Sequence, residues 1–357
     1  MLCYLRSKYW ILRAKGLVKQ YVHRCLICAK QNARPKTQLM GDLPTVRVTP
    51  SRPFVNSGVD FAGPFQILFN KGRGAKTVKT YIAIFICMST KAIHLELVGD
   101  LTSQAFIGAF KRFCARRGKC AHLWSDQGRN FVGANKELTD AWNEARLQFD
   151  GEIADTLVND GTQWHFIPAY SPNFGGLWEA GVRSMKQHLK KVLRTHLTFE
   201  EMSTILCEIE AGLNSRPLCP IDPSDAKMKP LTPGHFLIGE APLTVPSTSL
   251  QNVNVSNLAR WQHCQKILND FWRQWQKEYL SRLQQRPKWL KRTDEFKNGD
   301  IVLIKQDNLP PGKWALGRIV DKHPGPDGLT RVYSVKSGDN VVKRCVSKLC
   351  ALPIETE

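Results

Sequence analysis

Residues 81–88, YIAIFICM, are the stretch that decides the fold, because the run is apolar almost without interruption. Such a run predicts a strand buried on both faces of a sheet. Residues 92–98 alternate between apolar and polar, and residues 59–61 and 65–69 form an earlier strand interrupted near Gly63-Pro64. Three strands in succession predict a meander.

The elements that follow alternate between helix and strand. Thr102 or Ser103 can cap an amphipathic helix that ends near residue 116 and turns Phe106, Phe110 and Phe113 inward. The remaining predicted elements are a strand at 122–124, a helical insert within 134–163, a strand at 164–168, a helix from about residue 176 and a helix at 198–214. This order predicts an α/β core with a mixed sheet.

A second pattern begins after a proline-rich, irregular stretch. Ser256 is the expected cap of a long helix that runs to about residue 286, with an apolar residue every three or four positions. Packing within its own domain explains that stripe, and self-association is the alternative. From Phe296 onward, five short runs of strand-forming residues are separated by Pro-Gly and Asp-Gly turns, which predicts a small β-barrel.

Charge narrows the class of partner. The chain has 357 residues, and 51 Lys plus Arg against 31 Asp plus Glu leave a net charge of +20. A polyanion is the simplest partner for this surface. No apolar run approaches the roughly 18 residues of a membrane span, and the first residues do not form a signal peptide. We therefore expect a soluble intracellular protein, with most of its 11 cysteines reduced.

Residues 171–191, SPNFGGLWEAGVRSMKQHLKK, place one acid at the head of a basic helix. At about 100° per residue, the side chains of Glu179, Arg183, Lys186 and Lys190 share one face beside an apolar stripe. A solvated surface helix is the commoner interpretation. However, an ordinary intrahelical pair contributes only about 0.2–0.5 kcal/mol and needs fewer cations, so the surplus charge indicates an anionic partner.

Three carboxylates stand at the ends of predicted elements. Asp60 lies in the first strand, Asp126 closes the fourth, and Glu179 begins the basic helix. Together they can hold two Mg²⁺ or Mn²⁺ ions, which prefer oxygen ligands and share coordination with phosphates. Two such ions activate a water or a 3′-hydroxyl for in-line displacement at phosphorus. Singly, Asp60 and Asp126 are also compatible with simple turn chemistry.

Cys25 and Cys28 form a C-x2-C pair, which is half of a structural zinc site. Zinc needs four ligands, and only His23 lies nearby, at a spacing that does not match the usual upstream histidine pair. Either the other ligands lie before Met1 or the segment binds no zinc.

Three motifs, taken in order, carry a resemblance to a known family: GVDFAGPF at 58–65, LWSDQGRNFVGA at 123–134 and YSPNFGGLWEAGVRSMKQHLKKVL at 170–193. They resemble the catalytic core of integrases of retroviruses and long-terminal-repeat retrotransposons. The sequences of three further segments, LNSRPL, LTPGHFLIG and GDIVLIKQDNLPPGKWALGRI, are similar to those of integrases of the BEL/Pao retrotransposon group. The resemblance implies an RNase H-like core with Asp60, Asp126 and Glu179 as catalytic triad, and a terminal SH3-like barrel.

The same resemblance implies an activity and its partners. A Mg-dependent integrase trims the 3′ ends of element DNA and joins them to host DNA, so double-stranded DNA and a homo-oligomer are expected, with no membrane. Asn173, Arg183, Lys186 and Lys190 are the expected DNA contacts. Location in the nucleus after a cytoplasmic particle stage follows. The alternatives are a catalytically inactive DNA-binding remnant, or domesticated fragment, and an RNase H-like nuclease.

Five parts result from these expectations. They are a partial zinc-binding-like helical segment at 1–40, an RNase H-like catalytic core at 54–216, a linker at 217–255, a long amphipathic helix at 256–290 and an SH3-like barrel at 295–353. Two features depart from the family pattern. The spacing from Asp126 to Glu179 is long, 53 positions (179 − 126), and the histidine pair of the zinc module is missing, which suggests a fragment or a misplaced start.

Overall fold

The computed structural model describes residues 2–6, 8–27, 42–72, 74–148, 161–168, 185–191, 197–222, 229–242, 259–284, 295–306 and 309–352. The chain divides into two compact units, Met1–Pro44 and Thr45–Glu357. Among the described residues, no helix combines the length and the apolarity needed to cross a membrane.

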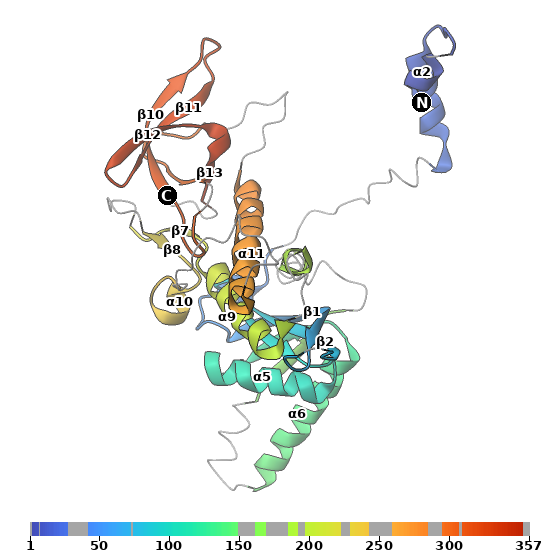
Figure 1. Ribbon diagram of the computed structural model, residues 1–357, viewed down its shortest axis with the longest axis vertical. Helices are drawn as coiled ribbons and strands as arrows, with labels where there is room; N and C mark the ends of the chain where they lie inside the picture. Colours follow the sequence, from blue (N-terminus) through green and yellow to red (C-terminus); the bar gives the residue numbers. More distant parts are fainter. Residues whose placement is uncertain are drawn as a thin grey trace. The chain divides into compact units, whose positions relative to one another are not determined.

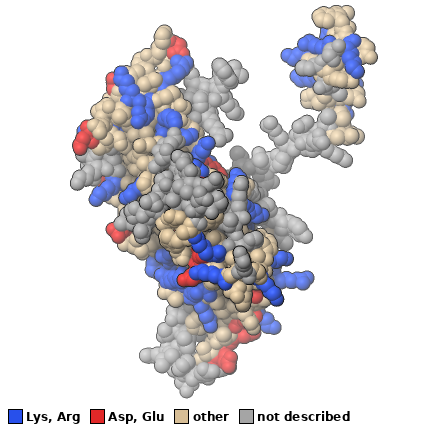
Figure 2. Space-filling view, viewed as in Figure 1, with Lys and Arg blue, Asp and Glu red and all other residues tan. Residues whose placement is uncertain are grey.

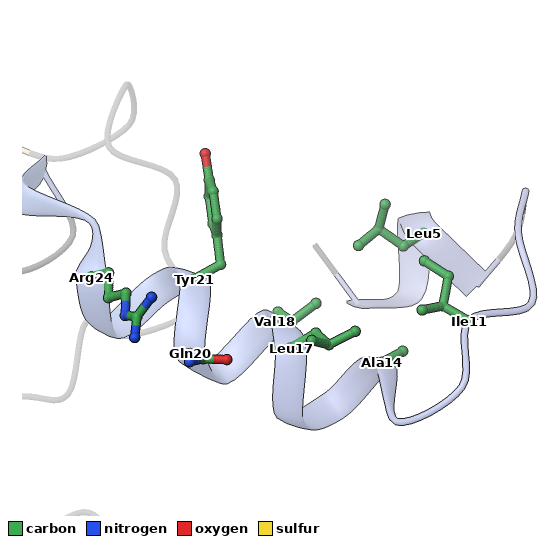
Figure 3. A pocket seen from close by; sticks show the side chains of 8 residues that line it. All are labelled: Leu5, Ile11, Ala14, Leu17, Val18, Gln20, Tyr21 and Arg24. Atoms are coloured by element: carbon green, nitrogen blue, oxygen red, sulfur yellow. The ribbon is translucent and has the colours of Figure 1, made fainter.

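The first unit contains two short helices, α1 (Leu2–Arg6) and α2 (Ala14–Arg24). Between them lies a pocket of about 490 Å³ whose walls are mainly apolar, and Figure 3 shows Leu5, Ile11 and Ala14 gathered at one end of it. Only Ala14 is fully buried in this unit, among the residues described there. Such a small unit buries little apolar surface and gains correspondingly little stability from it.

The second unit is built on a mixed sheet. Strands β1 (Asn56–Leu68), β2 (Thr77–Cys87) and β3 (Ile93–Val98) are antiparallel neighbours, which confirms the predicted meander. β4 (His122–Ser125) and β5 (Gln163–Phe166) add in parallel, so the order is β3-β2-β1-β4-β5. β1 continues through the predicted interruption, with a shift of register between Ala62 and Phe65. The short β6 (Leu197–Thr198) pairs with the far end of β1.

Helices cover both faces of this sheet (Figure 1). Because strand side chains alternate, Ile82, Ile84 and Ile86 of β2 pack on one face and Ala83, Phe85 and Cys87 on the other. α5 (Ser103–Arg117) and α6 (Arg129–Gln148) cover the phenylalanine-rich face. α9 (Phe199–Asn214), α11 (Arg260–Leu283) and the helical residues 185–191 cover the isoleucine face. The predicted central strand is therefore buried on both sides.

Hydrogen-bonding side chains fix where the helices begin. Thr102 Oγ1 accepts the Ala105 N–H at the start of α5, as expected. Thr198 and Glu201 form a reciprocal capping box on α9. The prediction that Ser256 caps the long helix is wrong, because α11 begins at Arg260 and Ala259 precedes it. There Gln262 Oε1 accepts the Ala259 N–H at 2.9 Å, which is the reach-back bond of a capping box.

The C-terminal part forms a five-stranded antiparallel sheet in the order β12-β11-β10-β9-β13. Its strands are β9 (Ile301–Ile304), β10 (Leu316–Pro324), β11 (Thr330–Ser337), β12 (Asn340–Cys345) and β13 (Leu349–Ala351). A closed barrel is not observed, since no ladder joins β12 to β13 in the described part of the chain. The single 3₁₀ turn Val346–Lys348 carries the chain across to the free edge of β9, and both outer strands remain edges.

Aromatic side chains join this C-terminal part to the core. Trp275 stacks on Tyr279, with ring centroids 5.3 Å apart, and Trp314 meets both rings edge-on. The Tyr279 hydroxyl donates to the Pro217 carbonyl at 3.0 Å, and Trp314 Nε1 donates to Ser215 Oγ at 3.3 Å. The smaller elements of this unit are α4 (Thr45–Val48), α10 (His235–Ile238) and the hairpin of β7 (Cys219–Pro220) and β8 (Pro230–Leu231).

Candidate active site

Two of the predicted carboxylates share one register of the sheet. β1 and β4 are parallel, and their paired residues differ by 66 positions, from Asn56 with His122 to Gly58 with Trp124. Continuing that register by two residues places Asp60 opposite Asp126, which directly follows β4. Side chains at matching positions of a parallel pair project to the same face, and adjacent strands lie about 5 Å apart. The fold therefore brings the two carboxylates together on one face of the sheet, at the carboxyl end of β4.

Their shared face is the one covered by α9 and α11. Asp60 pairs across the sheet with Ile84, a member of the core under those helices, and Trp124 also packs against that core. The Asp60 side chain is 27% exposed, because the helices cover it only in part. Its Oδ1 accepts the N–H of Phe61 at 2.7 Å, which limits rotation of the carboxylate.

Asp126 is exposed, and its side chain stabilises the turn that follows β4. Its Oδ1 accepts the Gly128 N–H at 3.0 Å, the local hydrogen bond that aspartate forms at the end of a strand. The preceding Ser125 is buried, and its Oγ accepts the Trp164 indole N–H from β5 at 2.8 Å. The end of β4 is thus held in place while the next side chain stays accessible.

The basic helix reaches this face through Lys186. Its Nζ lies 3.2 Å from Asp60 Oδ2. Met185 and Leu189 anchor the same helical residues in the core beneath α9 and α11. The buried His188 lies 2.5 Å from a carboxylate oxygen of Glu278 on α11, without a hydrogen bond of standard angle. Residues 185–191 are therefore tied to both the sheet and α11.

The other predicted site residues divide into two groups. Lys190 is exposed on the described part of the helix. Asn173, Glu179 and Arg183 lie outside the described residues, so the third carboxylate stays a prediction. No group of three or more His, Cys, Asp or Glu side chains in the described ranges could hold a metal ion.

The donor atoms that are described fit a hard divalent cation. Asp60 and Asp126 supply carboxylate oxygens, the ligand type that Mg²⁺ and Mn²⁺ prefer. Each carboxylate already accepts one backbone N–H, which leaves lone pairs for a metal. The ammonium of Lys186 already lies beside Asp60, so this position can hold a positive charge. The fit thus rests on two oxygen-donor residues on one face of the sheet.

The predicted zinc half-site, Cys25 and Cys28, is described only in part. Cys25 follows α2 directly and is half-buried, and His23 is exposed near the end of that helix. Cys28 lies outside the described residues. The proposed zinc half-site therefore stays a prediction.

The sequence analysis did not identify an imidazole pair that lies on the same face of the sheet as the carboxylates. His122 Nδ1 lies 3.1 Å from His165 Nε2, and the Trp124 ring stacks on His165 with centroids 4.6 Å apart. Burial, followed by the neighbouring His122, lowers the pKa of His165 below its ordinary value. His122 and Trp124 share the parity of Asp126, so the pair lies on the same face. The signal in the sequence was His122 and Trp124 at alternate positions of one short strand, with Trp164 and His165 adjacent on another.

Comparison with known proteins gives one partial family match and several structural neighbours. A family model described as a family of unknown function, DUF5641, matches residues 259–352, which run from the start of α11 to just beyond β13. No curated protein matches the sequence significantly. The structural neighbours belong to retroviral integrases.

One neighbour is the simian T-cell lymphotropic virus intasome in complex with PP2A regulatory subunit B56 gamma, with a TM-score of 0.36 and 11% identity over 94% of this chain and 90% of that chain. The HTLV-2 integrase catalytic core with magnesium matches in a trimeric form, with a TM-score of 0.30 and 15% identity over 52% of this chain and 97% of that one. The dimeric form of the same catalytic core matches with a TM-score of 0.29 and 16% identity, over 45% of this chain and 87% of that one.

Proposed function

We propose that this protein is a DNA integrase, a metal-dependent polynucleotidyl transferase encoded by a BEL/Pao-type long-terminal-repeat retrotransposon. The observation that carries the proposal is the common register of Asp60 and Asp126 on β1 and β4, with a basic helix reaching the same face through Lys186. Carboxylates from two neighbouring strands and a cationic helix are what phosphoryl chemistry on a polyanion needs. In this proposal, Glu179 supplies the third carboxylate.

The residues of the chain have distinct roles in this reaction. Asp60, Asp126 and Glu179 would hold two Mg²⁺ or Mn²⁺ ions, which activate the attacking water or 3′-hydroxyl and stabilise the leaving oxygen. The Phe61 and Gly128 N–H groups orient the two aspartates before any DNA arrives. Because these donors are fixed by the backbone, little reorganisation is needed during the reaction. Lys186 compensates the charge of Asp60 in this structure.

DNA would approach along the basic helix. Arg183, Lys186 and Lys190 recur at helical spacing from Glu179, and Asn173 precedes them in the sequence. The net charge of +20 favours a polyanion generally, and Figure 2 shows Lys and Arg side chains spread over much of the visible surface. These side chains would release counterions from the phosphates that they neutralise, so the affinity would depend steeply on salt.

The remaining parts of the proposal follow from this activity. The C-terminal sheet would be an SH3-like module that adds DNA contacts. Its basic side chains include Arg318, Lys322 and Lys336. The active form is a homo-oligomer, because two DNA ends must be joined to one target. The protein acts in the nucleus on chromosomal DNA after a cytoplasmic particle stage.

A strand-transfer assay tests the proposal. The full chain is incubated with Mg²⁺, a duplex oligonucleotide that mimics an element end, and a supercoiled plasmid as target. We expect trimmed 3′ ends and joined products, and neither with Asp126→Asn. Binding without any product would indicate an inactive DNA-binding remnant. Cleavage of an RNA–DNA hybrid without joining would indicate an RNase H-like nuclease instead.

A further inference from the structure

The end of the sheet opposite the carboxylates is assembled from four chain segments. Ser51 Oγ lies 3.4 Å from Ser89 Oγ, which joins the entry to β1 with the turn between β2 and β3. The Ala121 N–H donates to the Val55 carbonyl at 2.9 Å and joins the entry to β4. The buried Asn214, at the end of α9, bonds the backbone of Ile93 beside the same turn.

These four segments carry cations and no acids. Residues 45–55, 87–92, 115–122 and 214–220 contain seven Lys or Arg and no Asp or Glu. Arg116 and Arg117 are neutralised by Glu96 and Glu210 from β3 and α9. We define the basic end as Arg47, Arg52, Lys91 and Arg216.

Backbone carbonyls hold two of these cations without neutralising them. Arg52 donates to the carbonyls of Arg117, at 2.7 Å, and Lys119 at the end of α5. Arg216 donates to the carbonyls of Leu213 at 2.8 Å and Lys91 at 2.5 Å. The two guanidinium groups are therefore fixed in position by neutral partners, with Arg52 exposed and the pKa of Arg216 lowered by burial.

Three cations of the basic end, Arg47, Lys91 and Arg216, also lie close enough to repel one another. Burial lowers the pKa of the Lys91 ammonium, and the neighbouring Arg216 and then Arg47 lower it further. Lys91 and Arg52 are nevertheless exposed at the surface. An anion placed among these groups would relieve the repulsion and gain charge-assisted hydrogen bonds.

We propose that the basic end binds the phosphate backbone of duplex DNA and extends the DNA path beyond the carboxylates. This inference rests on the proposed function, in that it takes DNA to be the substrate. Asp60 lies four positions after Asn56 along β1, which is about 13 Å of strand. Duplex DNA carries one charge per about 1.7 Å of axis, so a duplex lying along β1 would bring about eight phosphate charges over this distance.

A small anion or an acidic protein fits the arrangement less well. The four cations come from separate segments and are spread over a surface, whereas a single phosphate is bound in a compact cradle. Planar guanidinium groups held at fixed positions match the repeated phosphates of a backbone. An acidic polypeptide would have to present its carboxylates with the same spacing, and its binding is a separate outcome of the test below.

The test uses the full chain with Arg47→Gln and Lys91→Asn combined. Arg52 and Arg216 are retained because they bond the backbone, and asparagine suits position 91, where φ is 57°. The matched control combines Lys136→Gln and Lys277→Gln, which remove the same charge from exposed positions on α6 and α11. The logarithm of the affinity for a mixed-sequence duplex is measured against the logarithm of salt concentration, without divalent metal.

We expect the basic-end variant to have a salt slope shallower by about 1.8, or roughly 0.9 per lost phosphate contact, with the control at the wild-type slope. Equal slopes in the two double variants would overturn the proposal. So would an unchanged DNA slope accompanied by reduced binding of poly-glutamate, which would assign the surface to an acidic protein. Strand transfer by the wild type is scored separately: its absence removes the proposed function and leaves a reduced slope as evidence for DNA at the basic end.

Discussion

Lys186 on the basic helix and Asp60 on β1 form an ion pair, with Nζ 3.2 Å from Oδ2, although 126 residues separate them in sequence. The side chains are 32% and 27% exposed, so solvent screens the pair and its contribution to stability is about 0–1 kcal/mol. The position of the ion pair matters more for metal binding than for stability. Lys186 occupies one side of a carboxylate that we propose as a metal ligand.

Lys186→Gln should therefore strengthen binding of a divalent cation. Without the ammonium, a metal no longer competes for Asp60, and a pair worth at most about 1 kcal/mol corresponds to a gain of at most about fivefold in affinity. Titration with Mn²⁺, followed by the loss of the free-ion electron paramagnetic signal, measures this directly. Lys190→Gln removes an exposed charge one turn away and serves as the control. Equal Mn²⁺ affinity in both variants would contradict the competition.

The three proposed catalytic carboxylates should each be indispensable. Asp60→Asn, Asp126→Asn and Glu179→Gln should abolish both 3′-end cleavage and strand transfer, because each removes a metal ligand. For Asp60 and Asp126, which are accessible to solvent, stability should change by no more than about 1 kcal/mol. Asp140→Asn, at an exposed position of α6, should keep full activity. Activity retained in any one of the three variants would remove that residue from the site.

The sequence was sufficient to predict the local elements of the core. The uninterrupted apolar run predicted the doubly buried β2. Thr102 or Ser103 was the predicted cap of α5, and Thr102 is the observed one. Burial patterns and helix caps depend on neighbours within a few residues, so a single sequence is enough to predict them. The predicted cap at Ser256 was wrong because α11 begins only at Arg260, where Gln262 Oε1 accepts the Ala259 N–H.

Contacts between distant segments could not be predicted in the same way. The parallel pairing of β1 with β4, which aligns Asp60 and Asp126, depends on how the whole sheet assembles. Likewise, the approach of Lys186 to Asp60 depends on how its helix packs against α9 and α11. Closure of the C-terminal barrel was expected from five short strands and from the family resemblance, and neither specifies which edges pair in this chain. The roles of Glu179 and Arg183 stay predictions.

Asn214 should be essential to the stability of the core. Its Oδ1 accepts the Ile93 N–H and its Nδ2 donates to the Ile93 carbonyl, both at 2.8 Å, in a site where Asn214 is 2% exposed. Asn214→Ala leaves both backbone groups buried and unpaired, which should lower the free energy of unfolding by roughly 2–4 kcal/mol. Urea denaturation measures the change. Asn143→Ala, at an exposed position of α6, should change it by about 0.5 kcal/mol or less.

The purified chain should contain less than one equivalent of zinc. Cys25 and Cys28 supply two of the four ligands that a structural zinc site requires. Elemental analysis after dialysis measures the content. A tight one-to-one content that disappears in Cys28→Ser would show that other residues of the chain complete the site.

A buried charge cluster between β3 and α9 should make stability depend on pH. His94 is 1% exposed, and its ring nitrogens lie 3.1 Å from Glu96 and 3.2 Å from Glu210. Burial lowers the pKa of His94, but hydrogen bonds to Glu210 and Glu96 outweigh burial, and the net pKa is above the ordinary 6.5. Burial raises the pKa of Glu96, and bonds to His94 and Arg112 outweigh it, so the net pKa lies below the ordinary 4.5.

These opposite shifts define a pH window of greatest stability. The contribution of His94 is complete below pH 6.5 and is lost as the pH rises through its raised folded-state pKa, because the neutral ring no longer attracts the two carboxylates. The contribution of Glu96 is complete above pH 4.5 and is lost as the pH falls through its lowered value. The cluster should therefore stabilise the fold most between about pH 4.5 and 6.5, and His94→Gln should remove the decline on the alkaline side. Urea unfolding at a series of pH values measures this, with His263→Gln on α11 as the control that should keep the wild-type profile. A decline of equal size in wild type and His94→Gln would assign the pH dependence to other groups.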